Sequence, residues 1–358
     1  MVNLLFVVGS TGGHLYPALS ILPYCKKLGF NCTILGPKSI KNKLKIEEDK
    51  LFLLDDLYLK EFNFPIKLIN SIRKTLEIIR DKDVVVSFGS IFSVPPSLVG
   101  KFRKKGLIIT DQNVLPGRAT RILSYFADIT IIPFQESISF IPKRTKKIIM
   151  LPPIREELIN IEKGEENTLL LFGGSLGSRT INNIGIELIK NAGLLDKKIK
   201  KIVLITGKNL FDEVVYKIKE QFNKDIQGAD KISLDLKNVE FTILKYSTNM
   251  ACLYKDSLIV ISRAGGSTLS ELLYLKKRAI VIPYPYALDN HQLINAKVVK
   301  KYSNFIDYIE EPIDFGKVLE KIEKLIQMEP EYLNEVSFFN FEVFFEKIME
   351  LTGKKDFL

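Results

Sequence analysis

The chain has 358 residues, of which 46% are apolar and 26% charged, and this composition excludes wholesale disorder. Its length favours two domains of ordinary size. The three cysteines, Cys25, Cys32 and Cys252, are odd in number and lack metal-type spacing, which argues against a disulfide framework or zinc site and favours a reducing cytosol.

The net charge of +10 is unevenly distributed. Residues 1–155 hold 24 Lys+Arg and 12 Asp+Glu, whereas the remainder of the chain has a net charge of −2. Lineage-wide lysine enrichment is one explanation, although it would raise both halves; an anionic substrate, membrane or nucleic acid is the alternative. Because no helix-turn-helix, zinc-finger or aromatic-rich RNA-binding pattern accompanies the charge, no nucleic-acid partner is expected.

Short apolar strands alternate with amphipathic helices in the first half. We predict strands at 3–8, 31–35, 84–88, 107–110 and 129–132, a helix from about Tyr16, and a helix over 65–80. The first 25 residues lack charge, but a glycine-rich turn and the absence of a basic leader argue against a signal peptide. No apolar stretch reaches the roughly 18–20 residues of a membrane span.

The pattern then restarts, with strands predicted at 168–172, 201–206, 239–243, 258–262 and 279–282 and a helix at 180–191. This order predicts an α/β protein with two parallel sheets, each covered by helices on both faces. We expect domains at 1–155 and 156–337, a linker within 151–163, and a C-terminal helix in 338–358 that packs across the domain junction.

Three glycine-rich turns, at 9–13, 173–178 and 263–268, each lie between a predicted strand and a helix. There the backbone can approach a ligand and the helix N–H groups can bind an anion. None is a Walker loop, and no acidic residue ends the second strand, so a nicotinamide dehydrogenase is disfavoured and no cofactor is expected.

The third turn precedes a helix in which Glu271 is expected in the first turn. Glycines and hydroxyls suit a diphosphate, and a carboxylate one turn further can accept both hydroxyls of a ribose. A favourable first-turn acid is the alternative role for Glu271. The turn thus indicates a nucleotide diphosphate site.

Six blocks in the right order resemble the MurG glycosyltransferases, over nearly the whole chain. The blocks are 11–18, 111–117, 153–157, 172–178, 262–271 and 289–296. That family transfers N-acetylglucosamine from UDP-N-acetylglucosamine to the 4-hydroxyl of the muramoyl sugar of lipid I, an undecaprenyl-linked acceptor, giving lipid II in peptidoglycan synthesis. The resemblance implies the glycosyltransferase B fold, two Rossmann-like domains facing across a cleft, and an inverting single displacement.

The resemblance also implies site residues. Thr11, Gly12 and Gly13 would line the cleft beside the phosphates, and Asn113 would contact the donor sugar. The other implied donor contacts are Arg155 and Ser175 for the nucleotide or diphosphate, Ser247 for the uracil pocket, Gly266, Ser267, Thr268, Leu269 and Ser270 for the diphosphate, Glu271 for the ribose and Gln292 for the sugar. Three features depart from the family: Ser10 replaces a glycine, Asp111 replaces a glutamate, and the loop at 87–95 has fewer glycines.

Single displacement needs a base for the acceptor hydroxyl and neutralisation of the leaving diphosphate. We hypothesise that His14 is the base, because an imidazole follows a phosphate-type turn at a strand's carboxyl end; capping a helix or binding a phosphate is the alternative. No Asp-x-Asp pattern indicates a metal, so helix N–H groups and Arg263 are expected to neutralise the charge, unless Arg263 forms a structural ion pair. His291 is expected to line the pocket or lie on the surface.

A lipid-linked acceptor requires docking on the bilayer, and the helix at 65–80 has the composition of an interfacial helix. Its expected membrane-facing residues are Leu68, Ile69, Ile72 and Leu76, beside Lys67, Arg73 and Lys74. Lys143, Arg144, Lys146 and Lys147 add a basic cluster. We therefore expect peripheral association with an anionic membrane at the cytoplasmic face of the cell membrane; an ordinary core-facing helix is the alternative.

Three other readings stay open on the sequence: a diacylglycerol glucosyltransferase, which shares the donor fold; a hydrolysing UDP-N-acetylglucosamine 2-epimerase, which calls for more carboxylates and histidines; and a non-catalytic sugar-nucleotide-binding subunit that recruits a membrane partner.

Overall fold

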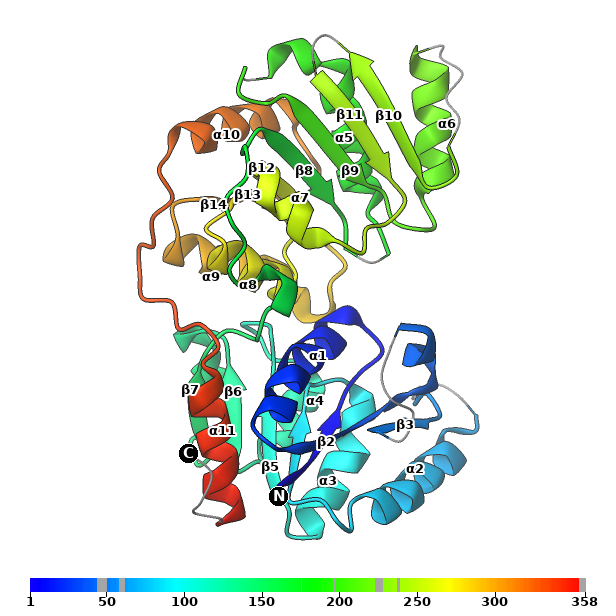
Figure 1. Cartoon of the computed structure of the whole chain (residues 1–358), viewed down its shortest axis with the longest axis vertical. Coiled ribbons are helices and arrows are strands. Elements are labelled where there is room, and N and C mark those ends of the chain that lie inside the picture. The colour runs from blue at the N-terminus through cyan, green and yellow to red at the C-terminus, as the bar shows by residue number, and fades with distance from the viewer. Residues whose placement is uncertain are drawn as a thin grey trace. The chain divides into compact units, whose positions relative to one another are not determined.

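The computed structural model describes residues 1–43, 50–57, 62–174, 176–195, 197–222, 228–236 and 239–353. The chain forms two compact units (Figure 1): residues 1–155 with 336–358, and residues 156–335. Each unit is built around its own seven-stranded sheet. None of the described helices is both long and apolar enough to cross a membrane.

The sheet of the first unit is entirely parallel, in the order β3-β2-β1-β4-β5-β6-β7. Its strands are β1 (Asn3–Val7), β2 (Asn31–Pro37), β3 (Leu51–Leu54), β4 (Val84–Ser87), β5 (Gly106–Thr110), β6 (Ile129–Ile132) and β7 (Lys146–Ile149). Its helices are α1 (Gly12–Lys27), α2 (Phe64–Ile78), α3 (Val94–Phe102), α4 (Arg118–Leu123) and α11 (Phe341–Thr352). The five predicted strands are confirmed within two residues, whereas β3 and β7 were not predicted.

Helices cover both faces of this sheet, as the continuous apolar runs in the strands require. Leu4 and Phe6 of β1 pack with α1 and α11 on one face, and Leu5 and Val7 pack toward α2, α3 and α4 on the other. The C-terminal helix was expected to pack across the domain junction, but its buried side chains belong to the core of the first unit. There Phe341 stacks on Tyr24, with ring centroids 3.6 Å apart.

Helix α1 begins at Gly12, four residues before the predicted start. The carbonyl of Thr11 already accepts the N–H groups of His14 and Leu15, so the glycine-rich turn is itself the first turn of the helix. This correction brings Gly12, Gly13 and His14 onto the helix N-terminus, where unpaired N–H groups gather.

The sheet of the second unit has the order β10-β11-β9-β8-β12-β13-β14 and is parallel except for the pair β10·β11. Its strands are β8 (Thr168–Phe172), β9 (Lys201–Ile205), β10 (Lys231–Leu236), β11 (Val239–Leu244), β12 (Ser257–Arg263), β13 (Arg278–Ile282) and β14 (Ile306–Tyr308). Its helices are α5 (Arg179–Lys190), α6 (Phe211–Phe222), α7 (Met250–Asp256), α8 (Gly266–Tyr274), α9 (His291–Tyr302) and α10 (Phe315–Gln327).

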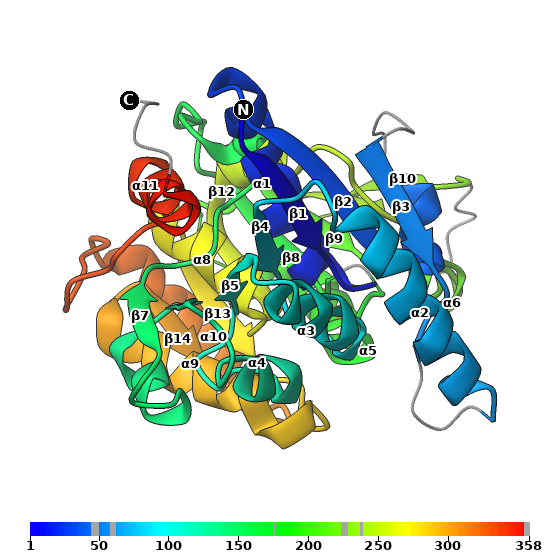
Figure 2. The same ribbon diagram turned by 90° about the horizontal axis from the view of Figure 1, so that it is seen from below.

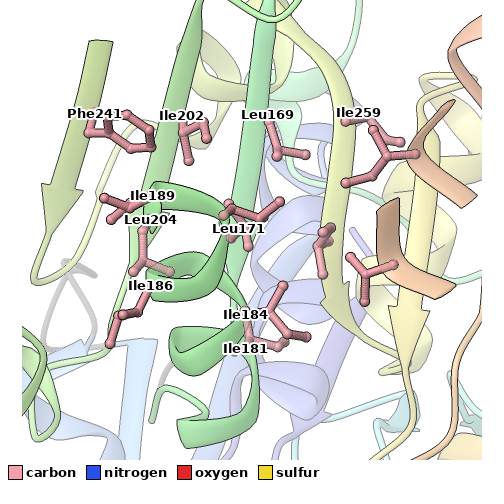
Figure 3. Close-up of a cluster of buried hydrophobic side chains, with 14 of the residues drawn as sticks. Leu169, Leu171, Ile181, Ile184, Ile186, Ile189, Ile202, Leu204, Phe241 and Ile259 are labelled. Atoms are coloured by element: carbon pink, nitrogen blue, oxygen red, sulfur yellow. The ribbon is translucent and has the colours of Figure 1, made fainter. Parts of the chain in front are cut away.

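One large cluster of buried apolar side chains lies on one face of this sheet (Figure 3). Leu169 and Leu171 of β8 lie among the buried faces of neighbouring strands and of α5, which contributes Ile181, Ile184 and Ile189. Because side chains alternate along a strand, Phe172 points to the opposite face, where Tyr254 of α7 packs edge-on against its ring.

The register of the parallel strands places the glycine turns. Phe172 at the end of β8 pairs with Ile205 and Ser262, and Arg263 pairs with Ile282. In the first unit, Val7 pairs with Leu35 and Ser87. The turns that follow these strands therefore share the carboxyl edge of each sheet, where ligands of open α/β sheets bind.

Candidate functional site

His14 occupies a narrow slot at the carboxyl edge of the first sheet. Its Nδ1 atom lies 2.7 Å from the carbonyl oxygen of Phe88. A side chain at Gly89 would begin 3.1 Å from this Nδ1, and one at Gly9 would begin 3.0 Å from the Cδ2 atom of His14. The glycines on either side thus leave room for the imidazole. Since a carbonyl only accepts hydrogen bonds, Nδ1 carries a proton, and in the neutral imidazole Nε2 then carries the lone pair.

Ser90 adjoins this slot in an unusual backbone conformation. Its φ of 78° and ψ of 153° lie in a region that essentially only glycine adopts. Its Cβ and Oγ approach within 2.8 Å of the point where a side chain at Gly9 would begin, and its Oγ is buried without a hydrogen bond among the described residues. The loop at 87–95, in which the sequence departs from the family, therefore holds local strain beside the candidate base.

Asn113 is presented by a loop that Asp111 organises. One carboxylate oxygen of Asp111 accepts the backbone N–H and the side-chain amide of Asn113, and the other accepts the N–H of Gly117 and the hydroxyl of Thr120. The Thr120 hydroxyl also lies 3.5 Å from the point where a side chain at Gly89 would begin. The structure thus brings the Asn113 loop next to the His14 slot, within one unit. Asp111 was recognised in the sequence only as a substitution.

The predicted phosphate-side residues of the first unit surround the start of α1. Thr11 is the exposed N-cap residue, and Gly12 and Gly13 are the first two helical residues. The guanidinium of Arg155 lies over the ring of Tyr16, with its carbon 5.7 Å from the ring centroid. A cation is therefore placed one turn along the same helix, where it can join the helix N–H groups in binding an anion.

The third glycine turn forms the N-terminus of α8. Gly265 is the N-cap, and nothing lies within 4 Å of the point where its side chain would begin, so a ligand can approach the backbone. The Oγ of Ser267 is buried and makes no hydrogen bond among the described residues. Together they form a site with N–H groups and a hydroxyl for an anion.

The other predicted diphosphate contacts in the first turns of α8 are Thr268, Leu269 and Ser270. Thr268 is half-buried, the side chain of Leu269 is buried, and the buried hydroxyl of Ser270 donates to the carbonyl of Gly266 at 3.0 Å. The side chains of Leu269 and Ser270 therefore pack the helix, and only their backbone groups can face a ligand.

Glu271 lies in the second turn of α8, because the helix begins at Gly266; the expected first-turn position is wrong. Its side chain is 6% exposed, and its Oε2 accepts a hydrogen bond from the hydroxyl of Tyr254 at 2.9 Å. This position argues against the alternative role of Glu271 as an acid that stabilises the helix dipole, since that effect is confined to the first turn. Glu271 is thus a buried, hydrogen-bonded carboxylate one helical turn beyond Ser267.

Arg263 is held by the second unit itself. Its guanidinium donates to Glu311 at 2.7 Å, to the hydroxyl of Thr180, and to the carbonyls of Ile282 and Pro283. Thr180 in turn donates to the same oxygen of Glu311. This is the arrangement of the structural ion pair, the alternative for Arg263. It ties the end of β12 to the end of β13, to the segment after β14 and to the start of α5.

Of the remaining predicted donor contacts, Gln292 lies in the first turn of α9 and Ser247 lies in the segment between β11 and α7. The Oε1 of Gln292 accepts the N–H of Tyr284, so its amide N–H groups are those that can donate to a sugar oxygen. The Oγ of Ser247 accepts the N–H of Asn249. Ser175 lies outside the described residues. His291 is oriented by the carbonyl of Leu288, at 2.8 Å from its Nδ1.

The expected membrane surface is only partly exposed. On α2, Ile69 is 65% exposed and Leu68 is half-buried, but Ile72 and Leu76 pack against the core of the first unit. Ile66 (64% exposed) lies one helical turn before Ile69, and the fully exposed Phe62 lies just before the N-cap of the helix. We refer to Phe62, Ile66 and Ile69 together as the apolar ridge. In the basic cluster, Lys147 donates to three backbone carbonyls and Lys146 pairs with Glu350.

No group of three or more His, Cys, Asp or Glu side chains is arranged to hold a metal ion among the residues that the structure describes.

Two family models match the chain: the N-terminal domain of glycosyltransferase family 28 over residues 4–132, and its C-terminal domain over residues 168–351. The chain belongs to glycosyltransferase family 28. The two matches together cover both units, and each includes glycine turns described above.

Among its relatives is the UDP-N-acetylglucosamine–N-acetylmuramyl-(pentapeptide) pyrophosphoryl-undecaprenol N-acetylglucosamine transferase of Caldanaerobacter subterraneus subsp. tengcongensis, which is 30% identical over 93% of each chain. The solved structure of Acinetobacter baumannii MurG has a TM-score of 0.66 at 17% identity, over 99% of this chain and 95% of that one. A UDP-GlcNAc 2-epimerase from Methanocaldococcus jannaschii scores 0.65 at 14% identity, over 98% and 100%. These structures establish the glycosyltransferase B fold, which is shared by enzymes with different reactions.

Proposed function

We propose that this family 28 protein transfers N-acetylglucosamine from UDP-N-acetylglucosamine to the 4-hydroxyl of the muramoyl sugar of lipid I, giving lipid II for peptidoglycan synthesis. The relative from Caldanaerobacter carries that activity in its name and matches the chain almost from end to end. The observation that carries the proposal is the oriented imidazole of His14, whose Nδ1 donates to the carbonyl of Phe88 at the edge of the sheet.

In this mechanism His14 is the general base. Its Nε2 lone pair takes the proton from the acceptor hydroxyl as the oxygen attacks the anomeric carbon of the donor sugar, and the bond from that carbon to the diphosphate oxygen breaks with inversion. The Asn113 loop and the amide of Gln292 orient the donor sugar.

The leaving UDP develops negative charge, which is stabilised at the N-terminus of α8. Its N–H groups and the buried Ser267 hydroxyl form hydrogen bonds with the diphosphate. On the first unit, hydrogen bonds of the same kind to phosphate oxygens come from Thr11, Gly12, Gly13 and Arg155. Arg263 contributes by holding the loops of this edge in place, because its guanidinium is already engaged by Glu311.

The acceptor is lipid-linked, so the proposal includes peripheral binding to the cytoplasmic face of the cell membrane. The surface that supports it is the ridge of Phe62, Ile66 and Ile69, with the exposed Arg73 and Lys74 on the same helix. Helix α3 packs beside α2 (Figure 2) and ends at Phe102, which is 75% exposed and precedes exposed basic residues. Apolar side chains flanked by cations are what an anionic bilayer binds.

The test is UDP release from UDP-N-acetylglucosamine with and without a lipid I analogue. Release that depends on the analogue and yields the disaccharide product is expected. Release without acceptor, together with an epimerised sugar, would instead identify a hydrolysing epimerase; release only with diacylglycerol would identify a glycolipid synthase; and donor binding without any turnover would identify a binding subunit.

A further inference from the structure

Tyr254 is a buried tyrosine whose hydroxyl donates to a carboxylate and not to a main-chain carbonyl. Its side chain is 0% exposed, and its O–H donates to the carboxylate Oε2 of Glu271 at 2.9 Å. The two residues come from different elements, α7 and α8. A buried tyrosine hydroxyl needs an acceptor, and a main-chain carbonyl is the commonest choice, as for Tyr332, whose O–H donates to the carbonyl of Leu273 at 2.6 Å.

The position of Tyr254 is fixed from two sides. Its ring packs edge-on against Phe172, at a centroid separation of 6.1 Å and an interplanar angle of 85°. Its carbonyl accepts the buried hydroxyl of Ser257, where β12 begins. The phenol therefore reaches Glu271 from a rigid base, and its hydrogen bond restricts rotation of the carboxylate about its last side-chain bond.

That rotation matters for a diol ligand. Two vicinal ribose hydroxyls donate side by side to a carboxylate only when its plane is turned toward them. Each carboxylate oxygen can accept two hydrogen bonds, so the bond from Tyr254 is compatible with the ligand contact. Burial also makes a carboxylate costly unless donors surround it, and Tyr254 supplies one of them.

We propose that Tyr254 is a positioning residue for donor recognition: it holds the Glu271 carboxylate in the orientation that binds the ribose hydroxyls of the nucleotide. This inference rests on the proposed function, since it takes UDP-N-acetylglucosamine as the donor. Tyr254 itself does not touch the donor and acts through Glu271. Its effect on the preference for ribonucleotide over 2′-deoxyribonucleotide donors is therefore indirect.

The experiment compares UDP-N-acetylglucosamine with its 2′-deoxyuridine counterpart in wild-type protein and in Tyr254→Phe, which keeps the ring and removes the hydroxyl. For Tyr254→Phe we expect the KM of the ribonucleotide donor to rise roughly five- to tenfold, kcat to stay within about twofold, and the preference over the deoxy donor to fall in proportion. In Glu271→Gln the same preference should fall, and the double variant should lose little more than the Glu271 variant alone.

Tyr332→Phe is the matched control, because it also removes a tyrosine hydroxyl that is hydrogen-bonded to α8, here to the main-chain carbonyl of Leu273 and not to the carboxylate of Glu271. It is expected to keep the donor preference. If Tyr254→Phe lowers the melting temperature but keeps the wild-type preference, the residue is purely structural and the inference is overturned. A wild type that uses the ribonucleotide donor without preferring it also overturns the inference while leaving the transfer reaction intact. A wild type without turnover of UDP-N-acetylglucosamine overturns the proposed function itself.

Discussion

The Nδ1 atom of His14 donates a hydrogen bond to the carbonyl oxygen of Phe88 across 2.7 Å, which fixes both the tautomer and the plane of the imidazole. If Nε2 is the base, His14→Ala should lower kcat by roughly 10²–10⁴-fold and change the pH dependence of kcat. Steady-state kinetics over a pH series measures both.

His291→Ala is the control for that substitution, since the Nδ1 of His291 also lies against a carbonyl, that of Leu288. It should leave the pH profile as in the wild type. A near-normal kcat with unchanged pH dependence in His14→Ala would show that His14 caps a helix or binds a phosphate.

Asp111 accepts four hydrogen bonds while its side chain is buried, so its removal should affect both stability and donor use. We expect Asp111→Ala to destabilise the first unit by roughly 2–4 kcal/mol, because the buried hydroxyl of Thr120 and the partly buried N–H groups of Asn113 and Gly117 lose their acceptor. We also expect kcat/KM for the donor to fall about 10–100-fold, because the Asn113 loop is no longer held in place.

Asp128→Ala separates the two effects. Asp128 also accepts a backbone N–H, from Leu107 at 2.9 Å, but it does so where β5 and β6 begin, at the other edge of the sheet. Asp128→Ala should lower the melting temperature and leave kcat/KM for the donor at the wild-type value. Equal kinetic losses in the two variants would mean that Asp111 acts only through stability.

The sheets and glycine turns could be predicted because their signals are local. β12 is a continuous apolar run, and each turn reads directly as glycines after such a run. β10 and β7 gave no comparable signal: β10 alternates apolar and polar residues at an edge, and β7 begins with two lysines that suggested a basic surface.

The candidate site residues were predicted from their motifs, but their hydrogen-bond partners were not. Tyr254 and Glu271 are 17 residues apart on separate helices, and Arg263 and Glu311 are 48 apart, so nothing in the local sequence links either pair. Only the fold brings α7 against α8, and the end of β12 against the segment that follows β14. The same long-range packing turned Ile72 and Leu76 of α2 toward the core.

Ser90 offers a test of the strain beside His14. At φ 78° and ψ 153°, a serine costs on the order of 1–3 kcal/mol, which glycine avoids. Because glycine also gains entropy in the unfolded chain, Ser90→Gly should stabilise by a net of about 1 kcal/mol. Chemical denaturation checks this. Ser90→Ala keeps the strained backbone and should gain less, and equal stability in the two variants would contradict the strain.

Asp307 should make part of the stability depend on pH. Burial raises the pKa of this carboxyl, but hydrogen bonds from Lys300 and Lys321 outweigh that effect and hold the pKa below its ordinary value of 3.8. A pKa that is lower in the folded state contributes stability above pH 4, roughly the unfolded value, and that stability is lost as the pH falls further. Asp307→Asn should therefore be less stable at neutral pH and lose less stability between pH 5 and pH 3. Parallel curves of melting temperature against pH would refute this.

The apolar ridge on α2 makes opposite predictions for its exposed and packed residues. Ile66 and Ile69 are each about two-thirds exposed, so replacing both with glutamate should leave the melting temperature nearly unchanged. The two glutamates would bury less apolar surface in a bilayer and would add negative charge. Binding to anionic vesicles, measured by flotation, should therefore fall at least tenfold.

Ile72→Ala and Leu76→Ala provide the contrast, because these side chains pack on the core. Each of these variants should have a lower melting temperature, but at temperatures where it is still folded it should bind vesicles as well as the wild type does. Binding of the wild-type protein should also weaken as ionic strength rises, since screening reduces the attraction of Arg73 and Lys74 to anionic lipid. Undiminished flotation of the double glutamate variant would place the membrane surface elsewhere on the chain. No preference of the wild type for anionic over neutral lipid would contradict binding to an anionic membrane.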